Sequence, residues 1–222
     1  MAFSEDFESG KIDQAVWTQS VTGDTVIEVQ NEKVAHGKFA LRVRCPAPAN
    51  KSVVGSRVLY IPETLRLHHY GRAYLFVTPK PPARHTILLM AGTPGFPQNK
   101  FLEVATTNGK WQLTYVDLRP DGDREDYHSG GTVPLGRWFC LEWEFNDRPD
   151  HVSVKIDGQP VYDSGFVSKR SGATGDLVGG FDEFALGFRL WGAAPEAFNV
   201  YYDDVALDTK PIGPIAGPSA KP

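Results

Sequence analysis

Short apolar segments separated by turn-forming residues recur along the whole chain, and this rhythm limits the possible fold more than any other feature. The segments are six to ten residues long, and several alternate apolar with polar side chains, as in RWFCLEWEF and EFALGFRLWG. Clusters of Gly, Pro, Asn and Asp stand between them, such as TTNGKW, PDGDRED and NDRPDH, and such clusters favour tight turns. No helical periodicity persists beyond a turn or two, although ETLRLHHY at residues 63–70 fits a short helix. The pattern predicts an all-β sandwich of antiparallel strands. The expected strands lie at residues 24–30, 39–45, 72–78, 85–91, 101–106, 111–117, 137–145, 151–158, 183–192 and 200–208.

The composition favours one large domain. Of the 222 residues 41% are hydrophobic, and the chain contains 13 Phe, 8 Tyr and 5 Trp, which is enough to bury a sizeable core. The 22 Gly and 17 Pro are spread along the chain as turn punctuation, without an internal repeat. We therefore expect a single, monomeric domain over residues 1–209. The tail at residues 210–222 has the Pro- and Gly-rich composition of a linker or a disordered end.

The charge pattern argues against nucleic acid and membrane partners. The 23 basic and 27 acidic side chains are interspersed, with a net charge of -4, so no basic stripe follows a phosphate backbone. No apolar run approaches the roughly 20 residues that span a bilayer. The start MAFSEDFESG lacks the charged and apolar regions of a signal peptide. If the protein is exported, its leader has been removed from this chain.

The two cysteines do not define a disulfide framework. Cys45 and Cys140 are too few for a disulfide-rich scaffold and lack the spacing of a zinc site. Two alternatives stay open, which are one bridge between them or two buried free thiols.

Alternation along two strands assigns faces. In RWFCLEWEF and EFALGFRLWG one face is apolar, whereas the other mixes Trp with Arg, Glu and small residues. Aromatic rings stack on sugar rings, and charged groups bind hydroxyls and carboxylates, so the mixed face suits a sugar-binding groove. Packing of Trp138 and Trp191 beneath neighbouring loops is the alternative. The expected core set is Phe139, Leu141, Trp143, Phe145, Phe184, Leu186, Phe188 and Leu190.

Two adjacent acids interrupt the apolar run FNVYYDDVALDT. Neighbouring side chains of a strand point to opposite faces, so either Asp203 or Asp204 faces the surface on which Val205 and Leu207 pack. A carboxylate in that place needs a cation, an ion pair or hydrogen bonds.

Several segments, taken in order, resemble a known family. They are EDFESG followed by Trp17, VAHGKFALRV, GRAYLFV, HTILLM, GRWFCLEWEF, VKIDGQPV, LGFRLWG and VYYDDVALDTKPIGP. Together they are similar to the secreted, cellulose-induced jelly-roll proteins of cellulolytic fungi and their bacterial relatives, whose fold is shared with glucuronan and alginate lyases. The resemblance implies a concanavalin-like β-jelly-roll of two antiparallel sheets, a secreted or extracytoplasmic location, and a polysaccharide or oligosaccharide as partner.

The resemblance also implies a structural calcium ion near the two acids. Glu8 and Asp204 would be its side-chain ligands, and backbone carbonyls from Asp6 and from the turn at residues 36–38 would complete the six to eight oxygens that Ca²⁺ takes. The alternative is that one of the two Asp side chains pairs with an Arg or caps a turn. The acidic stretch at residues 120–131 lacks the full spacing of a calcium loop and is expected to be a solvated loop.

Lyases of this fold cleave uronic-acid polymers by β-elimination. A cationic or amide group neutralises the substrate carboxylate, and a His or Tyr transfers the proton. Relatives carry a His-Leu-Arg-Ile-Gly-Gly-Gln type of motif, whereas Phe101, Glu103 and Thr107 stand at its His, Arg and Gln positions here. A glutamate in place of the arginine repels a uronate.

Strand alternation and motif position nominate other residues for the cleft. His85 is the first candidate for proton transfer and Tyr115 the second, with Arg189 or Arg72 as partner of the substrate carboxylate. A structural role for His85 is the alternative. The expected substrate-binding residues are Arg72, Tyr74, Glu103, Glu142 and Trp191.

The function predicted is therefore that of a polysaccharide lyase-like protein that acts on or binds a glycan containing uronic acid, with catalysis left open. A non-catalytic carbohydrate-binding module is the first alternative. A jelly-roll glycoside hydrolase is another, because Glu142 and Glu144 share one face of a strand. An extracellular structural module is a further class.

Overall fold

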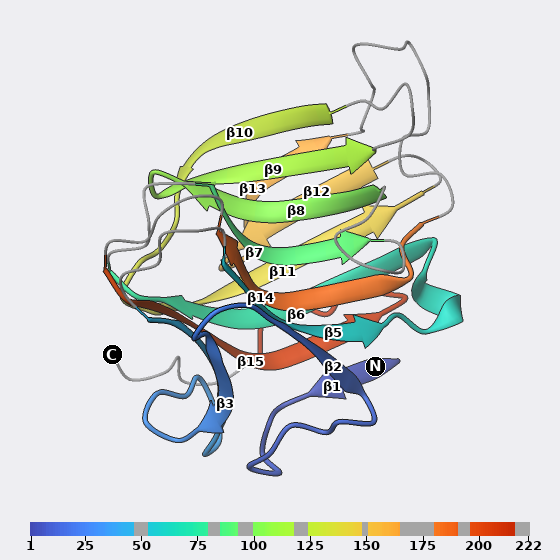
Figure 1. Cartoon of the computed structure of the whole chain (residues 1–222). Coiled ribbons are helices and arrows are strands. Elements are labelled where there is room, and N and C mark those ends of the chain that lie inside the picture. The colour runs from blue at the N-terminus through green and yellow to red at the C-terminus, as the bar shows by residue number, and fades with distance from the viewer. Residues whose placement is uncertain are drawn as a thin grey trace.

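The computed structural model describes residues 1–46, 53–79, 85–92, 100–117, 124–147, 151–164, 180–190 and 196–215. In these residues the chain forms fifteen strands and one short 3₁₀ helix. The strands pair in an antiparallel manner into two sheets, which Figure 1 shows stacked face to face. The prediction of an all-β sandwich of two antiparallel sheets is confirmed. No helix in the described part of the chain is long and apolar enough to cross a membrane.

The first sheet has eight strands. Its order is β13 (Gln159–Ser164), β12 (His151–Ile156), β11 (Trp138–Asn146), β6 (His68–Val77), β15 (Phe198–Asp208), β4 (Ala40–Cys45) and β3 (Val26–Gln30), with β1 (Phe3–Glu5) paired to β15. The second sheet has seven strands. Its order is β10 (Arg124–Thr132), β9 (Lys110–Asp117), β8 (Lys100–Thr107), β7 (Thr86–Gly92), β14 (Glu183–Leu190), β5 (Val53–Tyr60) and β2 (Trp17–Val21).

The core lies between the sheets and contains the residues that alternation assigned to it. All eight predicted core residues of β11 and β14 belong to the main hydrophobic cluster. Trp143 of β11 stacks on Phe184 of β14, with ring centroids 5.2 Å apart and planes inclined by 15°. Because these two strands belong to different sheets, the stacked pair joins the layers.

Two local expectations differ from the structure. Residues 124–131 of the segment expected as a solvated loop belong to β10, whose backbone pairs with β9 from Arg124 opposite Val116 onward, and residues 120–123 lie outside the described residues. A polar sequence forms a strand there because pairing with a neighbour decides strand formation more than intrinsic propensity. The predicted short helix is reduced to one 3₁₀ turn, η1 (Glu63–Leu65), and β6 already begins at His68. The turn in TTNGKW is confirmed, since Asn108 and Gly109 have φ of 53° and 71° between β8 and β9.

The cysteines are two buried free thiols, the second of the two alternatives. Cys45 lies on β4 and Cys140 on β11, and strands β6 and β15 separate these two strands in the sheet. Burial raises the pKa of Cys140 to about 12, so this thiol stays protonated.

Part of the predicted tail lies against the eight-stranded sheet. Arg72 of β6 donates from Nη1 to the carbonyl oxygen of Gly213 at 3.2 Å, and the amide of Ile215 donates to the Tyr74 hydroxyl at 3.0 Å. Two outward-facing side chains of β6 therefore hold residues 213–215 on the outer face of this sheet.

Candidate functional site

The side chains expected to line one groove divide between the two outer faces of the sandwich. His85, Glu103 and Arg189 lie on or beside the seven-stranded sheet. Arg72, Tyr74 and Glu142 lie on β6 and β11 of the eight-stranded sheet, and Trp191 is outside the described residues. The expectation of a single groove is not met, because β6 and β11 pair with each other in one layer whereas β7, β8 and β14 are neighbours in the other.

Tyr115 has a third placement. It is 1% exposed and belongs to the main core cluster, and its cross-strand neighbour on β8 is Leu102, another core residue. Glu103, next to Leu102, therefore points to the opposite side of the sheet. Tyr115 does not share a surface with His85 and Arg189. The sequence carried this signal, because Trp111 and Leu113, four and two residues earlier, are apolar residues of the same strand face and are also in the core.

A buried carboxylate meets a histidine on the outer face of the seven-stranded sheet. The Glu103 side chain is 4% exposed, and its Oε2 lies 2.9 Å from Nε2 of His85. The register of β7 with β8 places Thr86 opposite Thr106, which brings His85 beside Thr107. The short side chain of Ala105 lies between Thr107 and Glu103 on the same face and leaves room for the imidazole to reach the carboxylate.

This contact fixes the histidine tautomer. A carboxylate accepts hydrogen bonds, so the contact places a proton on Nε2 of neutral His85 and leaves the lone pair on Nδ1. The Thr107 hydroxyl lies 3.5 Å from Nδ1 but donates to Oε1 of Gln112 at 2.7 Å. Gln112 in turn donates from Nε2 to the Thr114 hydroxyl at 3.0 Å. Nδ1 is therefore the nitrogen of His85 that is placed to accept a proton.

Arg189 brings a cation to the same face. It is the cross-strand partner of Ile87, which also pairs with Ala105, so these three residues form one row across β14, β7 and β8. Burial lowers the pKa of Arg189, while the negative charge of Glu103 raises it. A guanidinium stays charged in proteins, so the half-buried Arg189 is a permanent positive charge beside Glu103.

An apolar cluster surrounds this polar group. Ile87, Met90, Phe101 and Ala105 form a second buried cluster, separate from the core between the sheets. Its members share the outer face with Glu103, since Met90 pairs with Glu103 and Ile87 pairs with Ala105. Such surroundings strengthen the charge interactions among His85, Glu103 and Arg189. Sequence reasoning missed this cluster and Gln112, although alternation along β8 places Phe101, Ala105 and Thr107 on the face of Glu103.

The acids predicted to bind calcium meet at one loop. Oε1 of Glu8 accepts from the backbone amides of Lys38 at 2.7 Å and Phe39 at 2.9 Å, and Asp204 Oδ2 lies 2.5 Å from Nδ1 of His36. Gly37, with φ of 67°, has no room for a Cβ because the Glu8 carboxylate would overlap it. An N-terminal acid and a C-terminal acid therefore contact the same short loop at residues 36–39.

The buried member of the acid pair has backbone partners. Asp203 is 1% exposed and accepts from the amides of Ala35 at 2.9 Å, His36 at 3.2 Å and Asp204 at 2.9 Å. Burial, and then the neighbouring Asp204, raise the pKa of Asp203 to about 7. A bulge between Asp203 and Ala206, with φ of 49° at Asp204, breaks the alternation and allows both carboxylates to approach the loop.

The oxygen atoms near this loop determine which ligands a bound cation would have. Asp6 accepts the Glu8 amide on Oδ1 at 3.1 Å. In the described ranges, no three His, Cys, Asp or Glu side chains are grouped to hold one metal ion. A Ca²⁺ ion at this place would therefore take much of its shell from backbone carbonyls, which this ion accepts.

Comparisons with known proteins locate the fold. No protein-family profile and no curated protein sequence matches the chain. Among solved structures, the cellulose-induced protein Cip1 superposes with a TM-score of 0.70 at 15% identity, over 95% of this chain and 99% of Cip1. The endo-β-1,4-glucuronan lyase of Trichoderma reesei has a TM-score of 0.70 at 14% identity, over 94% of this chain and 95% of the lyase. The chain has the Cip1 and glucuronan lyase fold. A sialidase also matches, with a TM-score of 0.64 at 12% identity, but this chain corresponds to only 18% of its length.

The coverage of the Cip1 fold is nearly complete on both sides, so the whole sandwich, and not a part of it, is shared. The predicted relationship to these jelly-roll proteins is confirmed at the level of the fold. At 15% identity, individual residues have to be interpreted from their contacts in this chain.

Proposed function

We propose that this chain binds an acidic polysaccharide on the outer face of the seven-stranded sheet and cleaves it by β-elimination. The observation that carries the proposal is the 2.9 Å contact between His85 and the buried Glu103, which holds Nε2 against the carboxylate and turns Nδ1 away from it. A glucuronan lyase with the same fold supports a polyuronate as the substrate class.

Each residue has a defined role in the proposed reaction. Arg189 pairs with the substrate carboxylate and stabilises the charge that develops when the C5 proton leaves. Nδ1 of His85 accepts that proton, the C5 electron pair forms the C4–C5 double bond, and the glycosidic C4–O bond breaks. The leaving oxygen takes up a proton from water. The hydroxyl of Thr107 lies 3.5 Å from Nδ1 of His85, and together with the amide of Gln112 it is proposed to bind sugar hydroxyls.

Glu103 is less of an obstacle to an acidic substrate than its sequence position indicates. Its carboxylate is buried and contacts His85, and its charge also acts on Arg189. The repulsion that a free glutamate exerts on a uronate is therefore largely compensated within the protein.

A non-catalytic carbohydrate-binding module is the second candidate. The placement of Tyr115 in the core favours it, because the second residue nominated for proton transfer does not reach the face of His85. Binding in that case uses Arg189 and the polar side chains of β8 and β9 without a bond-breaking step.

One assay separates the two candidates. The purified chain is incubated with a panel of polyuronates, the ultraviolet absorbance of the unsaturated product is followed, and retention on the same immobilised polymers is measured. The lyase produces absorbance, and we expect His85→Ala to slow this by about 100-fold or more while retention persists. His151→Ala, on the eight-stranded sheet, is the matched control and should leave the rate unchanged. Retention without product supports the binding module, and neither product nor retention contradicts both.

We also propose that Ca²⁺ stabilises the fold where Glu8 and Asp204 contact the loop at residues 36–39. The convergence of two acids from opposite ends of the chain on residues 35–39 supports this role. The ion would hold the N-terminal segment and β15 together, and it takes no part in the proposed elimination.

A further inference from the structure

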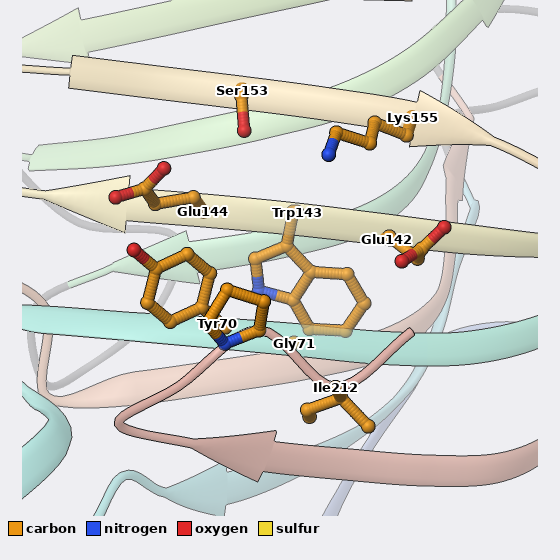
Figure 2. Close-up of a pocket in the computed structure, with 9 residues that line it drawn as sticks. Tyr70, Gly71, Glu142, Trp143, Glu144, Ser153, Lys155 and Ile212 are labelled. Atoms are coloured by element: carbon orange, nitrogen blue, oxygen red, sulfur yellow. The ribbon is translucent and has the colours of Figure 1, made fainter. Parts of the chain in front are cut away.

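A pocket of about 200 Å³ opens on the opposite outer face, away from His85 and Glu103. Figure 2 shows Glu142 and Glu144 on one strand, Ser153 and Lys155 on the neighbouring strand, and Ile212 across the opening. The strands are β11 and β12 of the eight-stranded sheet, and β6 contributes Tyr70 to the same pocket.

The base of the pocket lies directly over a close contact between two strands. Gly71 of β6 pairs with Trp143 of β11, and the indole of Trp143 occupies the space that a Cβ at Gly71 would require. Trp143 faces the core, where it stacks on Phe184. Because Gly71 and Trp143 both face the core, the outer face has only backbone at these two positions, and this backbone forms a shallow base between the outward-pointing neighbours.

The C-terminal segment forms the far wall. Pro211 and Ile212 line the pocket, and the segment that follows them is held by Arg72 at Gly213 and by Tyr74 at Ile215. Hydrogen bonds to side chains of β6, the strand that also supplies Gly71 at the base, therefore hold this wall in place. Pro211 and Ile212 add an apolar surface to a pocket whose other sides are mostly polar.

The two glutamates of the pocket differ in their partners. Glu144 contacts Nε2 of His68 at 2.9 Å and Nδ1 of His151 at 3.4 Å. Oε2 of Glu142 is fully buried and has no hydrogen-bond partner within the described residues. A buried carboxylate oxygen without a donor is costly, so Glu142 is the group in this pocket with unused capacity for a ligand.

The lining identifies the chemistry of that ligand. Glu142 accepts, the Ser153 hydroxyl and the Lys155 ammonium donate, and Ile212 offers an apolar contact. Sugar recognition combines polar groups at the ring edge with apolar contact to the ring face. The charged side chains that line the pocket are two carboxylates and one ammonium, and the unpaired oxygen of Glu142 favours a cationic group over a uronate.

We propose that this pocket binds a single sugar residue that carries an amino group, with the ammonium on Glu142. The site is separate from the proposed lyase face, lies on the other side of the core, and does not depend on that function. The pocket is smaller than the roughly 300 Å³ or more of sites for drug-sized ligands, which fits one sugar residue rather than an oligomer.

The test is an NMR titration with glucosamine, glucose and glucuronate that follows the backbone amides of Gly71 and Ser153. Glucosamine should shift these amides at the lowest concentration and glucuronate at the highest. Glu142→Gln, which keeps the shape of the side chain, should weaken glucosamine binding about tenfold, since one charge-assisted hydrogen bond is lost. The matched control is Glu32→Gln, because Glu32 is an exposed acid that pairs with Arg42 of the eight-stranded sheet. This variant should bind glucosamine as the wild type does.

His85→Ala separates this result from the proposed lyase activity, because it should lose product formation and keep glucosamine binding. Equal affinity for glucuronate and glucosamine overturns the proposal. Unchanged glucosamine binding in Glu142→Gln, or the absence of shifts at Gly71 and Ser153, also overturns it.

Discussion

The two outer faces of the sandwich both carry acids beside basic groups, but they use them differently. On the seven-stranded sheet, Glu103 is buried against His85 and acts on Arg189, so its charge is compensated within the protein. On the eight-stranded sheet, Glu144 has two histidine partners whereas Glu142 has a buried oxygen without one. A carboxylate that is already paired positions its neighbours, and one that is not retains capacity to bind a ligand.

The faces also differ in the ligand that each is proposed to bind. On the seven-stranded sheet, Glu103 engages Nε2 of His85 and acts on Arg189, and the proposed acidic sugar uses Nδ1 and that cation. On the eight-stranded sheet, the unpaired Oε2 of Glu142 is proposed to bind a cationic sugar. Residue types alone do not distinguish the faces, because each has Glu, His and a basic residue, and the difference comes from which side chains the strand register brings into contact.

The largest expected effect tests the core contact beneath the base of the pocket. Gly71→Ala places a methyl group where the Trp143 indole lies, and displacement of that ring from Phe184 should cost about 4 kcal/mol of unfolding free energy. Chemical denaturation measures the loss. In a Trp143→Leu background the space is open, so the same Gly71→Ala change should cost less than half as much. Equal costs in both backgrounds would show that the indole is not the limiting contact.

The buried His69 of β6 gives the next largest expected effect on stability, and it contrasts with His85 on the outer face of the other sheet. His69 is fully buried, its Nδ1 lies 2.9 Å from the Leu65 carbonyl oxygen, and burial lowers its pKa to about 4. In the unfolded chain this histidine takes up a proton near pH 6.5, whereas in the folded protein it does so only near pH 4. The contribution of neutral His69 to the unfolding free energy is therefore complete above about pH 6.5 and is lost as the pH falls from 6.5 to 4.

The difference in unfolding free energy between the wild type and His69→Leu should therefore shift by up to about 3 kcal/mol against the wild type between pH 7 and 4. Urea denaturation across that range measures it. The comparison with His69→Leu cancels the carboxylates that titrate in both proteins. A difference that stays constant with pH would contradict the buried neutral state of His69.

The fold was largely predictable from the sequence, because its signals are local. Alternation in RWFCLEWEF and EFALGFRLWG assigned both core faces correctly, and the Asn108–Gly109 turn follows from residues that accept positive φ. The segment that forms β10 was missed because its pairing with β9, and not its composition, makes it a strand.

The candidate site was predictable only in part, because its assembly depends on sheet order. His85, Glu103 and Arg189 were nominated and lie on one face, but alternation within a strand does not reveal which strands are neighbours. Arg72, Tyr74 and Glu142 have the right residue types and belong to the other layer. Bulges are a second limit, since the shift between Asp203 and Ala206 changes the direction of Asp204, which strict alternation does not anticipate.

The proposed calcium ion gives a smaller effect that belongs to neither face. If Ca²⁺ binds at Glu8 and Asp204, a chelator should lower the stability of the wild type by about 2 kcal/mol, or the melting temperature by about 5 °C. Glu8→Ala should start lower and respond little to the chelator. Differential scanning calorimetry measures both, with Glu32→Gln as a surface control. Equal losses in the wild type and Glu8→Ala would exclude Glu8 as a ligand.

The smallest expected effect is the one that distinguishes the two faces most directly. Arg189→Met keeps much of the length of the side chain and removes the cation beside Glu103, so retention on a polyuronate should weaken about tenfold, or by about 1.4 kcal/mol. Because the two faces lie on opposite sides of the core, glucosamine binding at Glu142 should not change. Glu142→Gln should give the reverse result, with glucosamine binding weakened and polyuronate retention intact. Calorimetric titration of both variants with both ligands measures the four affinities. If either variant weakens both ligands equally, the faces do not act as separate sites, because a change confined to one layer would then alter the whole sandwich.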